Sequence, residues 1–242
     1  MINMIGLGTI VNSIAVIAGG FIGLLLKGGL KQRYQDILMQ ALGLSVIFIG
    51  IAGVLQEMFL ITASGLETIG TMKLVLSLVF GAVTGEFINI NKHTESFGEW
   101  LKKKYSTPED HGFVDGFVST SLTICIGAMA IVGSLQDGLT GDASMLYIKA
   151  VLDGVIVIVF ASVFGKGAVF SAIPLFLFQG SITLSAVLIK PFITESAISY
   201  LSFIGSALIF CVGTNLMFHT KIKVANLLPS LIFAYLFHSL PI

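Results

Sequence analysis

Residues 112–154 read GFVDGFVSTSLTICIGAMAIVGSLQDGLTGDASMLYIKAVLDG, which is two apolar segments joined by an acidic, glycine-rich turn. Helices of about 20 mainly apolar residues cross a lipid bilayer. The second segment carries Lys149 and Asp153, which share one helical face because they are four residues apart. Ionisable groups in a bilayer are costly and usually face a protein interior, a water-filled path or each other. This stretch therefore predicts a hairpin of two membrane helices that carries the functional site.

The composition of the whole chain leads to the same fold class. Hydrophobic residues are 55% of the 242 residues, and charged residues are only 11%. Because a soluble domain carries about 25% charged residues, this chain has too few charges to cover a water-facing surface. We therefore predict an all-α, polytopic integral membrane helix bundle that forms one transmembrane domain over residues 1–242, with the lipid bilayer as its partner. The formal net charge of zero gives no reason to expect nucleic acid as a partner.

Eight segments have the length and apolarity of membrane helices, or come close to them. Their spans are 4–26, 37–59, 71–90, 113–135, 145–164, 168–189, 197–218 and 224–241. The last segment is short and contains Pro229, so seven membrane helices are the alternative count. Pro174 lies in the first turns of the sixth segment, where a kink or break is expected because proline has no amide hydrogen.

Basic residues predict how these segments are oriented. The loops after the first, third, fifth and seventh segments hold most of them, which are Lys27, Lys31, Arg33, Lys92, Lys102, Lys103, Lys104, Lys166, Lys221 and Lys223. Cytoplasmic loops are enriched in lysine and arginine, so we expect the N-terminus outside. The longest loop, 91–112, is then cytoplasmic, and the spacing of Phe97, Trp100 and Leu101 predicts a short amphipathic helix in it.

A weak internal repeat relates residues 41–57 (ALGLSVIFIGIAGVLQE) to residues 121–137 (SLTICIGAMAIVGSLQD). Both stretches end in Gly-x-Leu-Gln-acid, and each is followed by a segment that is entered with a lysine, Lys73 or Lys149. Both would cross the membrane in the same direction, so the pattern indicates a parallel duplication, and transporters commonly contain internal repeats. Chance similarity between apolar helices is the alternative.

Asp153 is the sharpest candidate for a functional group. It lies about 9 residues into its helix, which places it about 13 Å along the axis and close to the midplane of a hydrocarbon core of about 30 Å. One interpretation makes it a site for a cation or a proton, with Lys149 setting its charge. The other makes the two residues an internal ion pair with a structural role. The sequence leaves both interpretations open.

The segment before the turn is rich in small polar side chains. Five of them lie within seven residues, namely Ser119, Thr120, Ser121, Thr123 and Cys125. They suit a discontinuous helix or a lining that replaces the water around an ion, and Ser119, Thr120 and Thr123 are candidate binding residues. The alternative for each hydroxyl is a hydrogen bond to a carbonyl group of its own helix.

Other polar residues in the apolar segments are candidates for secondary roles. Asn12 and Gln179 are amides whose expected role is hydrogen bonding between helices, worth about 0.6 kcal/mol on average. Asn215 is a candidate for solute coordination, because a nearby glycine loosens its helix. Asp137, in the acidic turn, is a candidate for gating. Glu86 lies near the inner end of its segment, where an interfacial position is expected and a place in an inner gate is the alternative.

No motif of an enzyme is present in the sequence. It has no glycine-rich phosphate loop, no His-Glu-x-x-His and no nucleophile elbow. The two cysteines, Cys125 and Cys211, have no spacing typical of a metal site or a redox pair. We therefore expect a protein that is not an enzyme and that has no cofactor and no metal site.

Four runs of the sequence form a further pattern. They are Gly127-Ala128-Met129-Ala130-Ile131-Val132-Gly133 with Asp137-Gly138, Lys149-Ala150 with Leu152-Asp153-Gly154, Gly8-Thr9-Ile10-Val11-Asn12, and Gly213-Thr214-Asn215. These runs resemble a bacterial multi-pass membrane family known as domain of unknown function 554, and the resemblance covers nearly the whole chain. It implies a protein of the bacterial inner (plasma) membrane, in which Lys149, Asp153, Asp137 and Asn215 belong to a recurring pattern. It implies no substrate.

These features together predict a transporter or channel for a small polar solute or ion. The site would lie between the fourth, fifth and seventh segments, with binding residues Asp153, Lys149, Asn215, Ser119, Thr120 and Thr123 and secondary residues Asp137, Glu86, Asn12 and Gln179. The alternative is a membrane scaffold or sensor that does not transport and acts through the loop 91–112. A homodimer is expected, because internal symmetry and closely spaced glycines favour association of helices.

Overall fold

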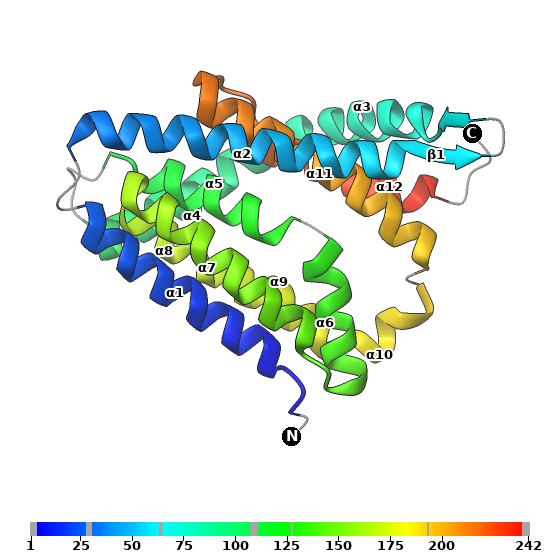
Figure 1. The fold of residues 1–242 in the computed structure, drawn as a ribbon, viewed down its shortest axis with the longest axis horizontal. Coiled ribbons are helices and arrows are strands. Elements are labelled where there is room, and N and C mark those ends of the chain that lie inside the picture. Colours follow the sequence, from blue (N-terminus) through cyan, green and yellow to red (C-terminus); the bar gives the residue numbers. More distant parts are fainter. Residues whose placement is uncertain are drawn as a thin grey trace. The chain divides into compact units, whose positions relative to one another are not determined.

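The computed structural model describes residues 4–27, 31–62, 65–106, 111–126, 128–192 and 194–238, and the chain is almost entirely helical there (Figure 1). The α-helices are α1 (Leu7–Lys27), α2 (Gln32–Met58), α3 (Thr71–Ile88), α4 (Ile90–Tyr105), α5 (Phe113–Cys125), α6 (Ala128–Thr140), α7 (Ser144–Phe164), α8 (Lys166–Phe170), α9 (Ala172–Leu184), α10 (Ala186–Ile189), α11 (Glu195–Phe218) and α12 (Ser230–Phe237). The remaining elements are the 3-10 helices η1 (Lys190–Phe192) and η2 (Val224–Leu227) and a hairpin of β1 (Phe59–Thr62) and β2 (Gly65–Thr68), which the sequence did not predict. The predicted all-α fold class is confirmed.

Six helical stretches of the described residues are long and apolar enough to cross a membrane, namely α1, α2, α3, α7, α8 with α9, and α11. α5 and α6 together make a seventh candidate, which is bent by 61°. The predicted count of eight is therefore corrected to six or seven. The predicted C-terminal span, 224–241, is replaced by an apolar helix over Val224–Phe237, which is shorter than the roughly 20 residues that a bilayer needs. Pro229, which has no amide hydrogen, separates η2 from α12 within it.

The interruption that the sequence predicted near Pro174 is present. α8 ends at Phe170 and α9 begins at Ala172, and the two are still one candidate span. With seven crossings the two ends of the chain lie on opposite sides of the membrane, whereas eight crossings would place both on one side. The orientation with the N-terminus outside stays a prediction from the lysine and arginine pattern.

The chain divides into two compact units. The first unit comprises residues 1–40, 94–125 and 129–192, and the second comprises 41–93, 126–128 and 193–242. The first unit contains α1, α5, nearly all of α6, and α7 to α9, and the second contains α3, α11 and α12. α2 begins in the first unit and ends in the second. The single transmembrane domain over residues 1–242 stays a prediction.

Glycines let α1 and α7 of the first unit approach each other closely. A Cβ atom built at Gly19 on α1 would lie 2.5 Å from the carbonyl oxygen of Gly154 on α7. Small residues allow such backbone contacts between membrane helices. Close to this contact along α1 and α7, the helices α1, α5, α7 and α9 share an apolar core that contains Val16, Ile124, Val157 and Leu175. These four helices therefore form the frame of the first unit.

One face of α3 is buried within the second unit. Its residues are spaced four apart and are Lys73, Ser77, Gly81 and Gly85. Gly85 packs against the backbone of Asn226, and Gly81 packs against that of Ser230. α3 thus lies directly on η2 and α12, and α2 and α11 approach each other through glycines in the same way.

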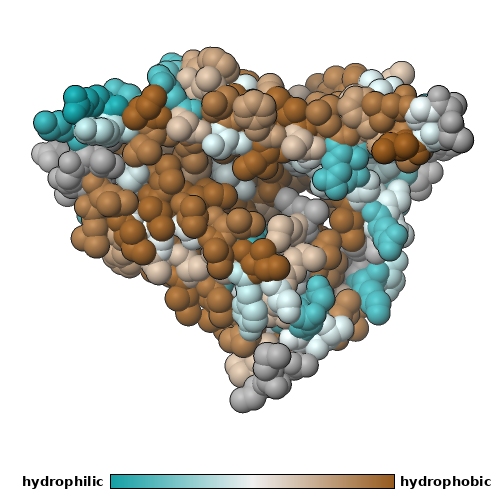
Figure 2. All heavy atoms as spheres, in the orientation of Figure 1, coloured by the Kyte–Doolittle hydropathy of each residue, from teal (hydrophilic) through white to brown (hydrophobic). Residues whose placement is uncertain are grey.

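Apolar side chains cover the outward faces of the helices. On α7, Ile148, Val151, Leu152 and Val155 are each at least half exposed. Figure 2 shows apolar side chains over most of the visible face, with hydrophilic ones confined to smaller areas. Exposed apolar surface of this extent is unfavourable in water, whereas it is favourable in contact with the hydrocarbon chains of lipid.

We predict that Gly19→Ala lowers the free energy of unfolding by about 1–3 kcal/mol, because the new methyl group overlaps the backbone of α7. The matched control is Gly154→Ala, whose Cβ atom would meet nothing nearer than 3.5 Å. This control should keep or raise the melting temperature, because alanine favours helices over glycine. Thermal unfolding in detergent, followed by circular dichroism, measures both variants. Equal melting temperatures would contradict the close approach of α1 and α7.

Candidate functional site

The membrane helix formed by α5 and α6 is broken. α5 ends at Cys125 and α6 begins at Ala128, and the two axes differ by 61°. The last carbonyl groups of a helix have no intrahelical amide partner, and they carry the partial negative charge of a helix end. The discontinuous helix that the polar side chains of 119–125 suggested is therefore present.

Lys149 on α7 bonds to one of these carbonyl groups. Its Nζ donates to the carbonyl oxygen of Ile124 at 2.8 Å and to Oδ1 and Oδ2 of Asp153 at 2.8 and 2.7 Å. An ammonium group has three hydrogens, so each of them has an acceptor. Lys149 and Asp153 are only 8% and 3% exposed. The spacing of four residues thus forms a buried ion pair.

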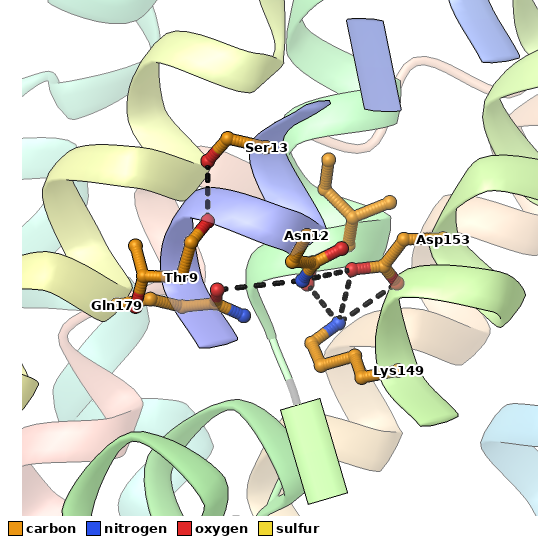
Figure 3. Close-up of polar contacts among 7 residues, drawn as sticks. Thr9, Asn12, Ser13, Lys149, Asp153 and Gln179 are labelled. Carbon is orange, nitrogen blue, oxygen red and sulfur yellow. Dashed lines mark hydrogen bonds and ion pairs between the residues drawn. The ribbon is translucent and has the colours of Figure 1, made fainter. Parts of the chain in front are cut away.

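Two amide side chains complete this arrangement. Asn12 on α1 donates from Nδ2 to Oδ2 of Asp153 at 2.9 Å and to Oε1 of Gln179 on α9 at 3.3 Å. Figure 3 shows Asn12 between Asp153 and Gln179, with Lys149 beside Asp153. Asn12 and Gln179 are fully buried. We call Asn12, Lys149, Asp153 and Gln179 the Asp153 cluster.

Several buried polar atoms of the first unit have no hydrogen-bond partner among the described residues. They are Oδ1 of Asn12, Nε2 of Gln179 and the hydroxyl oxygens of Thr9, Thr120, Ser134 and Thr183. An unpaired polar group in an apolar interior costs about 1–3 kcal/mol. Such groups are normally satisfied by bound water or by a polar ligand. The interior of the first unit is therefore suited to hold polar guests.

The hydroxyl-rich part of α5 divides into two kinds of residue. Thr123 donates to the carbonyl oxygen of Ser119 at 2.8 Å, and Ser121 donates to that of Phe117 at 2.5 Å. These bonds lie within one helix, which is the alternative that the sequence left open. Thr120 is fully buried, and its hydroxyl lacks a partner among the described residues. Of the three candidates in α5, Thr120 is thus the one that is fully buried with a hydroxyl free for a ligand.

Asn215, which the sequence placed at the site, belongs to the second unit. Its Oδ1 accepts hydrogen bonds from Thr220 Oγ1 at 2.6 Å and from Ile222 N at 3.0 Å, and its Nδ2 donates to Ile222 O at 2.8 Å. These bonds fix the turn after α11, in which His219 has a φ of 53°. The polar atoms of Asn215 are therefore used locally.

Glu86 also lies in the second unit, near the end of α3. It accepts hydrogen bonds from Lys223 and from Asn226 Nδ2, each at 2.6 Å. Asn226 Oδ1 in turn accepts from the amide of Asn91 at the start of α4. Glu86 thus connects α3 to η2, and its side chain is more than half exposed.

Asp137 is fully buried at the end of α6 and binds the start of α1. Its Oδ1 accepts from the amide of Gly6 and its Oδ2 from the amide of Gly8, both at 3.2 Å. A carboxylate at a helix N-terminus satisfies free amides and complements the helix dipole. Asp142, in the turn that follows, is half-buried, and hydrogen bonds from Ser144 and Gln136 hold its pKa below the ordinary value for aspartate. Asp137 therefore fixes α1 to α6.

The second copy of the internal repeat differs from the first in shape. Residues 41–57 lie in the continuous helix α2, whereas residues 121–137 run through the break between α5 and α6. Lys73 is buried, as is Lys149, but it donates to the carbonyl oxygen of His238 at 3.2 Å and lies 4.4 Å from the centroid of the Tyr200 ring. The repeat stays a prediction.

A helix runs through the loop where a short amphipathic helix was expected. Within α4, Leu101 is buried and packs against Phe113 and Phe117. Phe97 and Trp100 stack at 5.8 Å between ring centroids and are 42% and 52% exposed. The three lysines of the last turn, Lys102, Lys103 and Lys104, follow these rings. The placement of this helix on the cytoplasmic side stays a prediction.

Residues 7–239 match a family described as "Protein of unknown function (DUF554)". The chain belongs to this family. It is 34% identical over 225 residues to "Uncharacterized membrane protein YdfK" of Bacillus subtilis (strain 168), which covers 93% of this chain and 92% of that protein. It is 27% identical over 232 residues to "Uncharacterized protein YqgA" of Escherichia coli (strain K12), which covers 94% of each. No solved structure matches the chain.

Membership of the DUF554 family confirms the resemblance that the sequence runs carried. Together with the six or seven apolar helices, it makes this chain a membrane protein. The bacterial inner membrane as its location stays a prediction.

Sequence reasoning found the ion pair of this DUF554 protein but missed its surroundings. Asn12 and Gln179 were expected to bond between helices, and the structure shows that they bond to each other and that Asn12 bonds to Asp153. The carbonyl group of Ile124 could not be named as a partner of Lys149 beforehand. The cluster of small polar residues at 119–125 predicted a break in the helix, and this break was the sequence feature that pointed to a free carbonyl group there.

We predict that Asp153→Asn lowers the free energy of unfolding by about 3–5 kcal/mol, because it leaves the ammonium group of Lys149 buried without its counter-charge. Lys149→Met in the same chain should restore most of this loss, because neither charge then remains. Unfolding in mixed detergent micelles measures both, with Glu67→Gln in the exposed strand β2 as the control for loss of one acid. A double variant as unstable as the single one would contradict the pairing.

Proposed function

We propose that this protein moves a small polar solute or an ion across the membrane and that the Asp153 cluster is its binding site. The observation that supports this most is a buried ion pair held at the break of a membrane helix, beside polar atoms that have no partner in the described part of the chain. The proposed role needs no nucleophile and no cofactor.

The depth of the pair supports a transport role. Asp153 is the tenth residue of α7, which has 21 residues, so it lies about 13 Å from the start of the helix. Binding sites of many transporters lie near the midplane of the bilayer and are formed by discontinuous helices with exposed carbonyl groups. The end of α5, with the carbonyl group of Ile124, has this geometry.

The hydrogen bonds of the cluster suggest how a guest would bind. All three donors of Lys149 are used, so a cation can reach Asp153 only if Lys149 moves away from it. The carbonyl group of Ile124 would then keep one bond to the ammonium group. The free atoms of Asn12 and Gln179 and the hydroxyl of Thr120 would bind a polar guest or its water. The exchange of partners at Asp153 is thus the proposed binding step.

A second candidate is a scaffold or sensor that acts through α4. The stacked and exposed rings of Phe97 and Trp100, followed by lysines, are typical of a helix that meets a membrane surface or a partner. In this case Trp100→Ala should abolish function, whereas variants of the Asp153 cluster that fold should not.

We predict that proteoliposomes with the wild-type protein pass at least one of a panel of small ions and polar solutes, and that Asp153→Asn reduces this flux by about tenfold or more, the size expected for losing a charged partner of the guest. The double variant Lys149→Met, Asp153→Asn should be stable and equally inactive, which separates function from folding. Flux is followed by radiotracer uptake, and Glu67→Gln should retain it. Wild-type flux in the double variant would remove the Asp153 cluster from the mechanism.

A further inference from the structure

A row of buried polar side chains leads from the Asp153 cluster along α1 and α9. On α1, Thr9 lies three residues before Asn12, and on α9, Thr183 lies four residues after Gln179. Residues at these spacings share one helical face, one turn apart. Thr9 and Thr183 therefore lie one helical turn from Asn12 and Gln179, on the same faces of α1 and α9, and form a second pair of polar residues.

The contacts between α1 and α9 indicate how Thr9 and Thr183 lie relative to the Asp153 cluster. The atom nearest to a Cβ built at Gly180 is the methyl carbon of Thr9, at 3.9 Å. Asn12 thus lies beside Gln179 and Thr9 beside Gly180, so α1 and α9 run antiparallel. Figure 3 shows Thr9 close to Gln179. Thr9 and Thr183 are therefore the next polar groups beyond the Asp153 cluster.

Asp137 lies at the far end of this row. It accepts a hydrogen bond from the amide of Gly8, which precedes Thr9. The next residue of α6, Gly138, packs against the carbonyl group of Thr183. Gly8 and Asn12 are four residues apart, so the two ends of the row are separated by about 6 Å along α1. The row thus links the turn between α6 and α7 to the ion pair.

Four atoms along the row are buried and have no partner among the described residues. They are the hydroxyl oxygens of Thr9 and Thr183, Oδ1 of Asn12 and Nε2 of Gln179. Each of these four residues is at most 3% exposed. They offer both donors and acceptors at steps of one helical turn, which matches the two to four polar partners that a buried water molecule requires.

We propose that water molecules join these groups into a path along which protons pass between Asp137 and Asp153, so that the proton is the ion that this protein moves. This inference rests on the proposed transport function. A proton that arrives at Asp153 neutralises its carboxylate, and Lys149 keeps its own proton and its bond to Ile124. When Asp153 releases the proton again, the ion pair forms once more.

Among the described residues, few charged groups lie near the two ends of the path. Asp142, in the turn between α6 and α7, acts on Asp137 through its charge. Asp153 is faced by Lys149 on its own helix and by the thiol of Cys125 on α5. The amides of Gly6 and Gly8 bond to Asp137, and the side chain of Asn12 on α1 bonds to Asp153.

The water in the path is tested by cysteine labelling, independently of transport. In a chain with Cys125→Ala and Cys211→Ala, Thr183→Cys should react with a small cationic methanethiosulfonate at least about tenfold faster than Leu175→Cys, because a thiol in a dry apolar site is inert. Leu175 is the matched control, since it is fully buried on the same helix within the apolar core. Equal rates, measured by mass spectrometry, would overturn the hydrated path.

The proton is tested in proteoliposomes that contain a trapped pH dye, with a potassium gradient and valinomycin to set the membrane potential. Wild-type protein should acidify the lumen, and Thr183→Val and Asp137→Asn should each slow this severalfold, because they remove links of the path. Ser181→Ala, at an exposed serine of α9 that bonds to Phe178 O, should leave the rate unchanged.

The possible failures of this test are distinguishable. If the wild type passes another ion or a solute in a way that depends on Asp153, but passes no protons, the proton inference is overturned and the proposed function stands. If no species passes, both are overturned. If protons pass at the wild-type rate in both Thr183→Val and Asp137→Asn, the proton does not use this path, and the inference is overturned.

Discussion

A lysine ammonium group at membrane depth must have an acceptor for each of its hydrogens, and this requirement connects the main features of the first unit. Lys149 meets it with both oxygens of Asp153 and the carbonyl group of Ile124. In a continuous helix over 113–140, that carbonyl group would accept the amide four residues later. The break after α5 and the buried lysine therefore depend on each other.

Close packing makes this arrangement possible. Asn12 reaches Asp153 because α1 and α7 approach each other at glycines, so that the amide side chain spans the remaining distance. The apolar core around Val16, Ile124 and Leu175 holds α1, α5 and α9 in place on one side of the polar groups. Polar atoms that lack a partner within the described part of the chain are a cost to stability, and such costs are common where a protein binds a ligand or a water molecule.

The parts of the structure that the sequence predicted are those set by local rules. Composition and segment length give the membrane helices, and a spacing of four residues gives the bond between Lys149 and Asp153. The bond between Asn12 and Asp153 joins residues 141 positions apart, and no local rule predicts such a contact. The eighth segment was predicted from its apolarity, whereas the helix Val224–Phe237 is too short to cross a bilayer. Asn215 carried the right chemistry for a site, but the turn after its helix uses its polar atoms.

The contact between Asp137 and the start of α1 has a consequence for how the chain is made. The ribosome releases α1 into the membrane long before it adds Asp137, which follows Gly8 by 129 residues. Until α6 is synthesised, the first turn of α1 has no carboxylate for its free amides, and Asn12 has neither of its later partners. The first helix to be inserted is thus among the last to form its final hydrogen bonds. Until then, the polar side chains of α1 need other partners, such as water or the insertion machinery.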